Sequence, residues 1–142
     1  MEWKKLDIKA LSIEVLRIYL GIALFLKGIY FIGHMQDLFL YLSKSFQYID
    51  FIFAHYVVLA HIVGGLFISL GLFTRVAALM NLPVLFSALV FVKIETGFFS
   101  MNSDFELAFM VFMLLLFFVV QGSGLVSLDS YIKKSYNELS HE

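Results

Sequence analysis

The stretch that decides the fold is AHYVVLAHIVGGLFISLGLF, residues 54–73, followed after Thr74 and Arg75 by VAALMNLPVLFSALVFVKI, residues 76–94. Each segment is apolar and about 20 residues long, the length that an α-helix needs to cross a hydrocarbon core of ~30 Å. Because only a short turn separates them, the two predicted helices are antiparallel neighbours.

Two further segments, residues 11–33 and 105–120, have the same apolar character. The whole chain is 61% hydrophobic and 15% charged, with a mean hydropathy of +0.92. A soluble domain is only about half apolar and about a quarter charged, so the excess apolar surface must face lipid. The sequence therefore predicts an all-α integral membrane protein, in which one transmembrane domain over residues 1–142 forms a four-helix bundle.

The segment MQDLFLYLSKSFQYIDFIF, residues 35–53, is too interrupted by polar residues to span a membrane, yet it is rich in aromatic residues. It is predicted to be a partly helical interfacial segment between the first two spans. The positive-inside rule then places both termini in the cytoplasm, because six Lys and Arg residues share one side and two lie on the other. The first group is Lys4, Lys5, Lys9, Arg75, Lys133 and Lys134, and the second is Lys44 and Lys93.

The composition also excludes several kinds of chemistry. The net charge of −1 argues against a nucleic-acid-binding surface. The absence of cysteine excludes disulfide exchange, a thiolate-held iron–sulfur cluster and a cysteine nucleophile. We find no catalytic triad order, phosphate-binding loop or metal-binding motif, so a stand-alone enzyme is not expected and no metal site is predicted.

An ionisable side chain at mid-membrane costs roughly 2.5–3.5 kcal/mol, so each one needs a reason. Lys27 and His61 are predicted to lie deep in their spans, while several other ionisable residues approach the outer interface. A cluster of this kind can hold a polar headgroup or relay protons, whereas the alternative is interhelical hydrogen bonding and simple exposure at the span ends. The candidate contacts are Lys27, His34, His55, His61, Lys93, Glu95 and Glu106.

A second group, Arg17, Arg75 and Asp129, is predicted at the cytoplasmic edge. Asp129 is expected to pair with Arg75 or Arg17 and so to close the bundle. The alternative is a site for an anion or a lipid headgroup, although charges at span ends also snorkel at little cost.

Three stretches carry a resemblance to a known family: LRIYLGIALFLKG (residues 16–28), LAHIVGGLFISLGLFTRVAAL (59–79) and QGSGLVSLD (121–129). Together they resemble the DoxX family of small bacterial membrane proteins. The resemblance implies a multi-pass four-helix bundle in the cytoplasmic (inner) membrane. One branch of that family resembles the small subunit of a thiosulfate:quinone oxidoreductase, and other members are linked to thiol and superoxide defence assemblies. This sequence carries His61 where many members carry Glu, and Phe31 where many carry Lys.

These observations favour an accessory subunit of a quinone-linked or thiol/sulfur-linked redox assembly, binding a quinone or a lipid between its helices. Its expected partners are membrane lipids and other membrane or envelope proteins, or further copies of the chain. The leading alternative is a structural or assembly subunit without chemistry of its own. A haem held by His34 and His55 and a small proton-coupled transporter using Lys27, Glu95 and Glu106 are less favoured.

Overall fold

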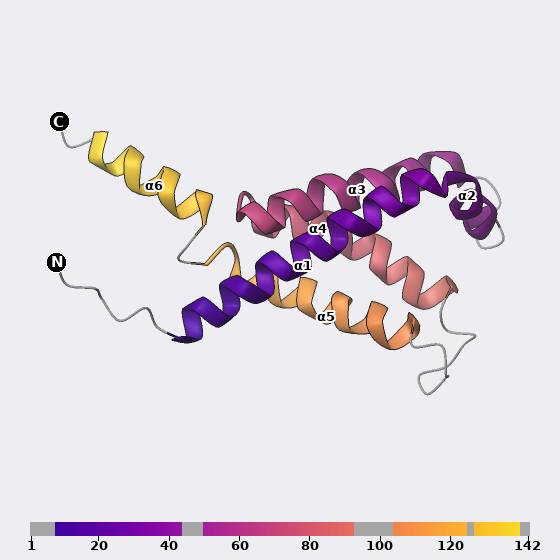
Figure 1. Ribbon diagram of the computed structural model, residues 1–142, viewed down its shortest axis with the longest axis horizontal. Coiled ribbons are helices and arrows are strands. Elements are labelled where there is room, and N and C mark those ends of the chain that lie inside the picture. The colour runs from indigo at the N-terminus through magenta and orange to yellow at the C-terminus, as the bar shows by residue number, and fades with distance from the viewer. Residues whose placement is uncertain (1–7, 44–49, 93–103, 125–126, 140–142) are drawn as a thin grey trace.

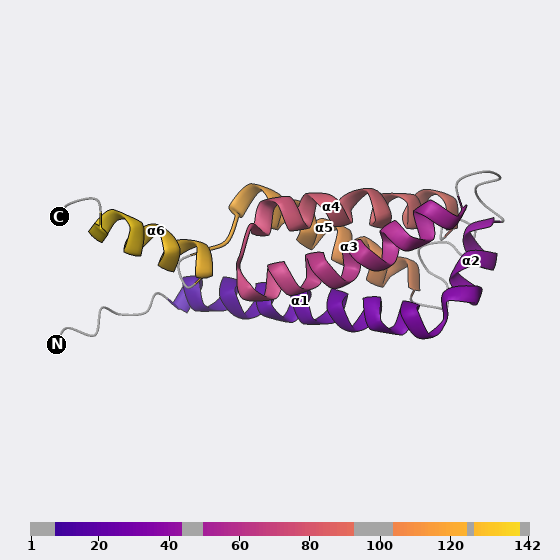
Figure 2. The same cartoon turned by 90° about the horizontal axis from the view of Figure 1, so that it is seen from above.

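The computed structural model describes residues 8–43, 50–92, 104–124 and 127–139, and within these residues it contains helices and no strand. Four long helical segments lie side by side, a short helix covers one end, and the last helix projects from the other (Figures 1 and 2). In order they are α1 (Ile8–Gly33), α2 (Met35–Ser43), α3 (Asp50–Leu70), α4 (Thr74–Ser87), the π-helix η1 (Ala88–Val92), α5 (Asp104–Gln121) and α6 (Leu128–Leu139). We call α1, α3, α4, η1 and α5 the helical body.

The helices follow the predicted apolar segments with small shifts at their ends. The interfacial segment predicted over residues 35–53 divides into α2 and the first turn of α3, which begins at Asp50. The third predicted helix changes from α to π geometry after Ser87. Lys93 and Glu95 lie outside the described residues.

The turn between α3 and α4 is built by a left-handed glycine. Gly71 has φ +69°, and its N–H donates to the carbonyl of Ile68 while the Leu72 N–H donates to that of Phe67. This is the Schellman pattern, in which a glycine just past the helix satisfies the last free carbonyl groups. The turn reverses the chain within a few residues, so α4 runs back beside α3.

Helices α1 and α3 touch through their backbones at Gly21 and Gly65. A Cβ atom added at Gly65 would lie 2.5 Å from the Phe25 backbone nitrogen and 2.7 Å from the Gly21 oxygen. The backbones can approach this closely because Gly21 and Gly65 have no side chains, and small residues are a common means by which membrane helices pack. The contact holds α3 against the face of α1 that carries Arg17, Leu20 and Leu24.

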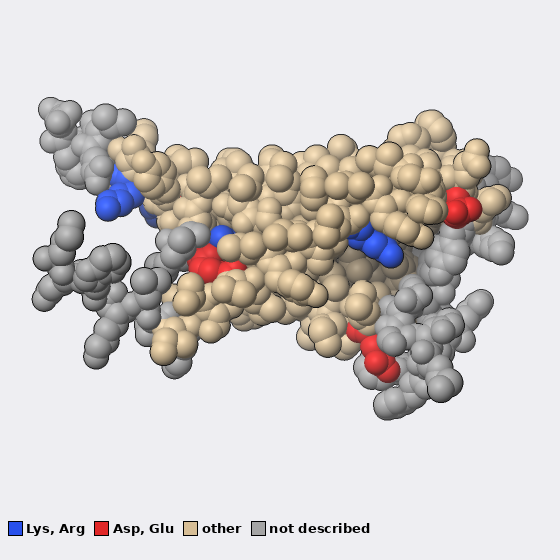
Figure 3. Space-filling view, viewed as in Figure 1, with Lys and Arg blue, Asp and Glu red and all other residues tan. Residues whose placement is uncertain are grey.

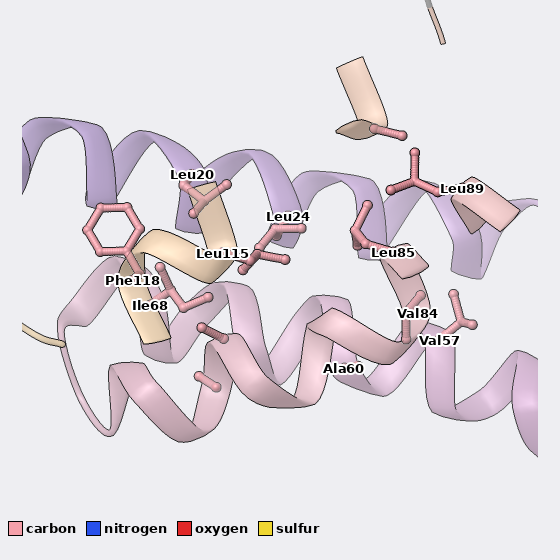
Figure 4. Close-up of a cluster of buried hydrophobic side chains, with 13 residues drawn as sticks. Leu20, Leu24, Val57, Ala60, Ile68, Val84, Leu85, Leu89, Leu115 and Phe118 are labelled. Atoms are coloured by element: carbon pink, nitrogen blue, oxygen red, sulfur yellow. The ribbon is translucent and has the colours of Figure 1, made fainter. Parts of the chain in front are cut away.

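The apolar core joins all four long segments (Figure 4). Its most deeply buried large side chains are Leu20 from α1, Ile68 from α3, and Leu115 and Phe118 from α5. Burying a side chain of this size contributes about 1.5–3 kcal/mol in water. In lipid, the same contacts stabilise mainly through close packing.

Helix α4 is tied to α3 by polar groups as well as apolar ones. The Asn81 amide, fully buried, donates to the carbonyl oxygens of Ala60 and Ala77, both at 3.0 Å. The Tyr56 hydroxyl donates to the carbonyl of Met80 at 2.7 Å. Pro83 lies one turn further along α4 and lacks a backbone hydrogen, so this part of the helix has fewer hydrogen bonds of its own.

Candidate functional site

A cleft of about 550 Å³ lies in the half of the helical body nearest α2. Helices α1 and α5 diverge toward α2 (Figure 1), and side chains from both helices line the cleft. The space-filling view shows this face hollowed where the two helices separate (Figure 3). Its volume falls in the ~300–1,000 Å³ range of small-molecule sites. Most of the lining is apolar, including Leu24, Leu38, Val57, Leu85 and Val111.

His61 is the buried ionisable residue of this cleft, with 5% of its surface exposed. Its Nδ1 atom donates a hydrogen to the Val57 carbonyl of the preceding turn at 2.8 Å. The ring of Phe31 stands nearly perpendicular to the imidazole, with the ring centres 5.3 Å apart. Gly28 leaves room for this arrangement, because a Cβ atom there would lie 3.0 Å from the His61 Cβ. The imidazole is therefore held in one orientation by α1 and by its own helix.

Lys27 and the aromatic residues that follow it form the α1 wall. The Lys27 ammonium lies 5.2 Å from the centre of the Tyr30 ring and 5.3 Å from that of Phe31. These distances are within the ~6 Å range of cation–π attraction, which favours a cation beside aromatic faces. The next turn adds His34, whose ring stacks on Tyr30 with centres 4.1 Å apart and whose Nδ1 donates to the Tyr30 carbonyl.

The remaining polar lining comes from α2 and α4. Asp37 lies in the first turn of α2 and is exposed at the end of the cleft. Ser87 lies on α4, and its hydroxyl donates to the Val84 carbonyl at 2.8 Å. The cleft thus combines apolar walls with a few polar groups at fixed positions, as ligand sites commonly do.

The opposite end of the helical body, which we call the arginine end, is organised by a buried ion pair. Arg17 Nη2 lies 2.7 Å from Glu14 Oε2, with 3% and 5% of the two side chains exposed. Arg17 also donates to the Ser123 carbonyl in the segment after α5. Gly124, with φ +72°, passes so close to Glu14 that a side chain there would collide with the carboxylate. The pair therefore fastens the end of α5 to α1.

The second hollow, about 570 Å³, lies at the arginine end beside Arg75 and Asp129. Asp129 Oδ2 accepts a hydrogen bond from the Phe73 N–H at 3.0 Å, and the Asp129 N–H donates to the Gly71 carbonyl. Arg75 Nη2 donates to the Val120 carbonyl at 3.2 Å. These side chains hold backbone segments together, so we take the cleft near α2 as the candidate functional site.

Comparison with protein families gives one match, to the model described as DoxX, over residues 12–94. The matched region is more than half of the chain and runs from α1 to just past η1. The chain belongs to the DoxX family. Comparison with curated proteins and with solved structures gave no match.

As a DoxX-family chain it is a membrane protein, and its described helices agree with this. Residues 10–33 of α1 and 51–70 of α3 are long and apolar enough to cross a membrane, while residues 74–90 and 105–121 form shorter apolar helices. Large apolar side chains point outward from the body: on α1 alone Tyr19, Ile22, Leu26 and Ile29 are each about half exposed or more. Such a surface suits lipid and not water.

Three residues predicted from the sequence, Lys27, His34 and His61, line one cleft in this DoxX-family chain. His55 is exposed, and its Nδ1 donates to the Phe51 carbonyl of its own helix. Glu106 is exposed on the α5 face that also carries Met110 and Met113. Neither is among the described residues that line the cleft. Lys93 and Glu95 lie outside the described residues.

The structure changes the expected partners at the arginine end. In place of the expected pairing of Asp129 with an arginine, Asp129 accepts from the backbone of Phe73, and Arg17 pairs with Glu14. The separation of Glu14 and Arg17 by three residues was a signal for this, because such residues share one helix face. In the cleft, sequence reasoning missed Tyr30, Asp37 and Ser87, which no motif marks.

Proposed function

We propose that this DoxX-family chain crosses the bacterial inner membrane four times, with both termini in the cytoplasm. The lengths of α1 and α3, the pairing of α4 with α5 and the outward apolar side chains support this. The excess of Lys and Arg in the tails and near the α3–α4 turn supports the orientation. The arginine end then faces the cytoplasm, and the cleft opens toward lipid in the outer half of the membrane.

We further propose that the cleft binds a quinone or a lipid of similar shape, and that the chain serves as an accessory subunit of a redox assembly. One observation carries the proposal: the buried His61 and the Lys27 side chain line a mainly apolar cleft, which is hollowed on the face shown in Figure 3. The cleft has room for an aromatic headgroup, and the rings of Tyr30 and Phe31 offer flat surfaces to it.

A quinone fits the residues present, since its polar oxygens meet the Lys27 and His61 side chains while its ring meets apolar walls. When bound, a quinone would supply the electron-accepting chemistry that the side chains of this cysteine-free chain lack. The chain's own contribution would be to bind and orient the ring and to exclude water from it. Electrons would enter from a partner protein in the assembly.

The test compares two tryptophan substitutions on α1 in the purified full chain in lipid nanodiscs. Ala23→Trp places a bulky ring in the cleft lining at an exposed position, while Leu26→Trp lies on the same helix outside the described lining. We expect decylubiquinone, supplied in either redox form, to bind the wild type and the Leu26 variant with saturation, and the Ala23 variant at least tenfold more weakly.

Equal binding to all three proteins would locate the ligand elsewhere. No binding to any of them, together with purification of the chain in a stable envelope complex from its native membrane, would instead favour the structural subunit. These outcomes separate the two functions, because a subunit that only holds others together needs no saturable small-molecule site.

A further inference from the structure

The polar groups of the cleft differ in a way that selects among ligands: one wall can accept hydrogen bonds and the other can donate them. The Nδ1–H of His61 on α3 and the hydroxyl of Ser87 on α4 each donate a hydrogen bond to a backbone carbonyl, at 2.8 Å in both cases. A neutral imidazole has one N–H, so Nε2 is left as an acceptor, and a hydroxyl that has donated keeps only its lone pairs. The α3–α4 wall therefore offers acceptors to a ligand.

The end of the cleft near α2 has the same character. His34 Nδ1 donates to the Tyr30 carbonyl, which leaves its Nε2 as an acceptor, and the Asp37 carboxylate is an acceptor when ionised. Hydrogens are supplied by the α1 wall, from the Lys27 ammonium and the Tyr30 hydroxyl. Among the described side chains that line the cleft, donors to a ligand are thus confined to α1.

This asymmetry has a direct consequence for binding. A ligand whose polar atoms are all acceptors can form hydrogen bonds only with Lys27 and Tyr30. At the α3–α4 wall, neither its oxygen nor the His61 Nε2 atom has a hydrogen to donate to the other. Buried polar groups left without a partner cost about 1–3 kcal/mol, and sites built on a hydrogen bond reject analogues that lack it. A ligand with a hydroxyl directed at His61 avoids this penalty.

We propose that the cleft prefers a lipid-soluble ring compound in its hydroxyl-bearing, reduced form, with a hydroxyl donating to His61 Nε2 and the opposite oxygen accepting from Lys27. This inference rests on the proposed function, since it states which form of the ligand the same cleft prefers. The ring would lie between the apolar walls, with its tail leaving between α1 and α5 toward the lipid. The preference follows from which hydrogens the protein has already used.

The experiment measures dissociation constants of three probes that share one ring and one tail: decylubiquinol, decylubiquinone and the dimethyl ether of decylubiquinol. Binding to the wild type in nanodiscs is measured by isothermal titration calorimetry without oxygen. We expect the quinol to bind about tenfold more tightly than the quinone and the ether, the ratio that corresponds to about 1.4 kcal/mol. The His61→Leu variant should lose this ratio, whereas His55→Leu, changed at an exposed histidine of the same helix, should keep it.

The three probes test the proposal on the wild type alone, so it stays open to refutation even if the His61 variant does not fold. Equal binding of the quinol and the ether would overturn the proposed selection while leaving a ring-binding cleft in place. Binding of none of the probes would overturn the proposed function and this inference together. Preference for the quinone would reverse the assignment of His61 as an acceptor.

Discussion

Removing one partner of the Glu14–Arg17 pair should unfold the arginine end, and the substitution Glu14→Gln is the sharpest way to do so. The two side chains are almost completely buried and their charged atoms lie 2.7 Å apart. Glutamine keeps the size of the side chain but removes its charge, so the buried Arg17 guanidinium loses the carboxylate with which it pairs. Breaking a buried pair in this way costs about 3–5 kcal/mol, or between about two and four powers of ten in the unfolding equilibrium constant.

The magnitude can be checked with a second substitution. Replacing both residues, as Glu14→Leu with Arg17→Met, removes both charges together and takes the Arg17 donor away from the Ser123 carbonyl. A lost hydrogen bond to a buried acceptor costs about 1–3 kcal/mol, and a buried ion pair is often replaceable by apolar residues of similar volume. We therefore expect the double variant to be less destabilised than Glu14→Gln alone.

The assay is reversible unfolding in mixed micelles of increasing SDS content, followed by far-ultraviolet circular dichroism. Glu106→Gln serves as the matched control, because it makes the same chemical change at an exposed site and should alter stability by less than about 0.5 kcal/mol. The reasoning would be refuted if Glu14→Gln behaved like this control, or if the double variant lost as much stability as Glu14→Gln alone.

Three further substitutions test the packing of the helical body. Gly65→Val should destabilise the fold by about 1–3 kcal/mol or more, because the added atoms would overlap the α1 backbone 2.5 Å away, and unchanged SDS stability would contradict the α1–α3 contact. Gly122→Ala should lose about 1–2 kcal/mol because φ there is +82°, whereas Gly33→Ala, with open space around its Cβ, should lose less; equal losses would contradict the left-handed turn. Tyr56→Phe should lose about 1 kcal/mol with the hydrogen bond to Met80, and thermal melting in detergent unaltered from the wild type would argue against that bond.

Much of the candidate site was visible in the sequence because depth in a membrane helix can be counted. Lys27 and His61 stood out as ionisable residues far from the ends of apolar segments, and both line the cleft. Ser87 and Asp37 were not predicted, because a serine within an apolar helix and an aspartate at the start of a short helix do not by themselves indicate a binding site. Their role depends on where α4 and α2 lie relative to α1, which no local pattern states.

The partners of the charged residues also divide into those that local sequence predicts and those that depend on tertiary packing. Helical spacing places Glu14 and Arg17 on one face, so their pairing is a local property that the sequence contains. The interactions of Asp129 with Phe73 and of Arg17 with Ser123 join residues more than fifty positions apart. They depend on the left-handed glycines Gly71, Gly122 and Gly124, which redirect the chain after α3 and after α5.

By itself, the sequence determined the apolar segments, the short antiparallel turn and the membrane character of the chain, because each follows from composition, length and nearest neighbours along the helix. Only the tertiary structure decided which helix faces lie together. The contact of Gly21 with Gly65 and the divergence of α1 from α5 create a cleft in which His61 and Ser87 offer acceptors and Lys27 offers hydrogens. This separation of hydrogen-bond donors from acceptors depends on the directions of side chains from different helices, and these directions are fixed only once the helices have packed.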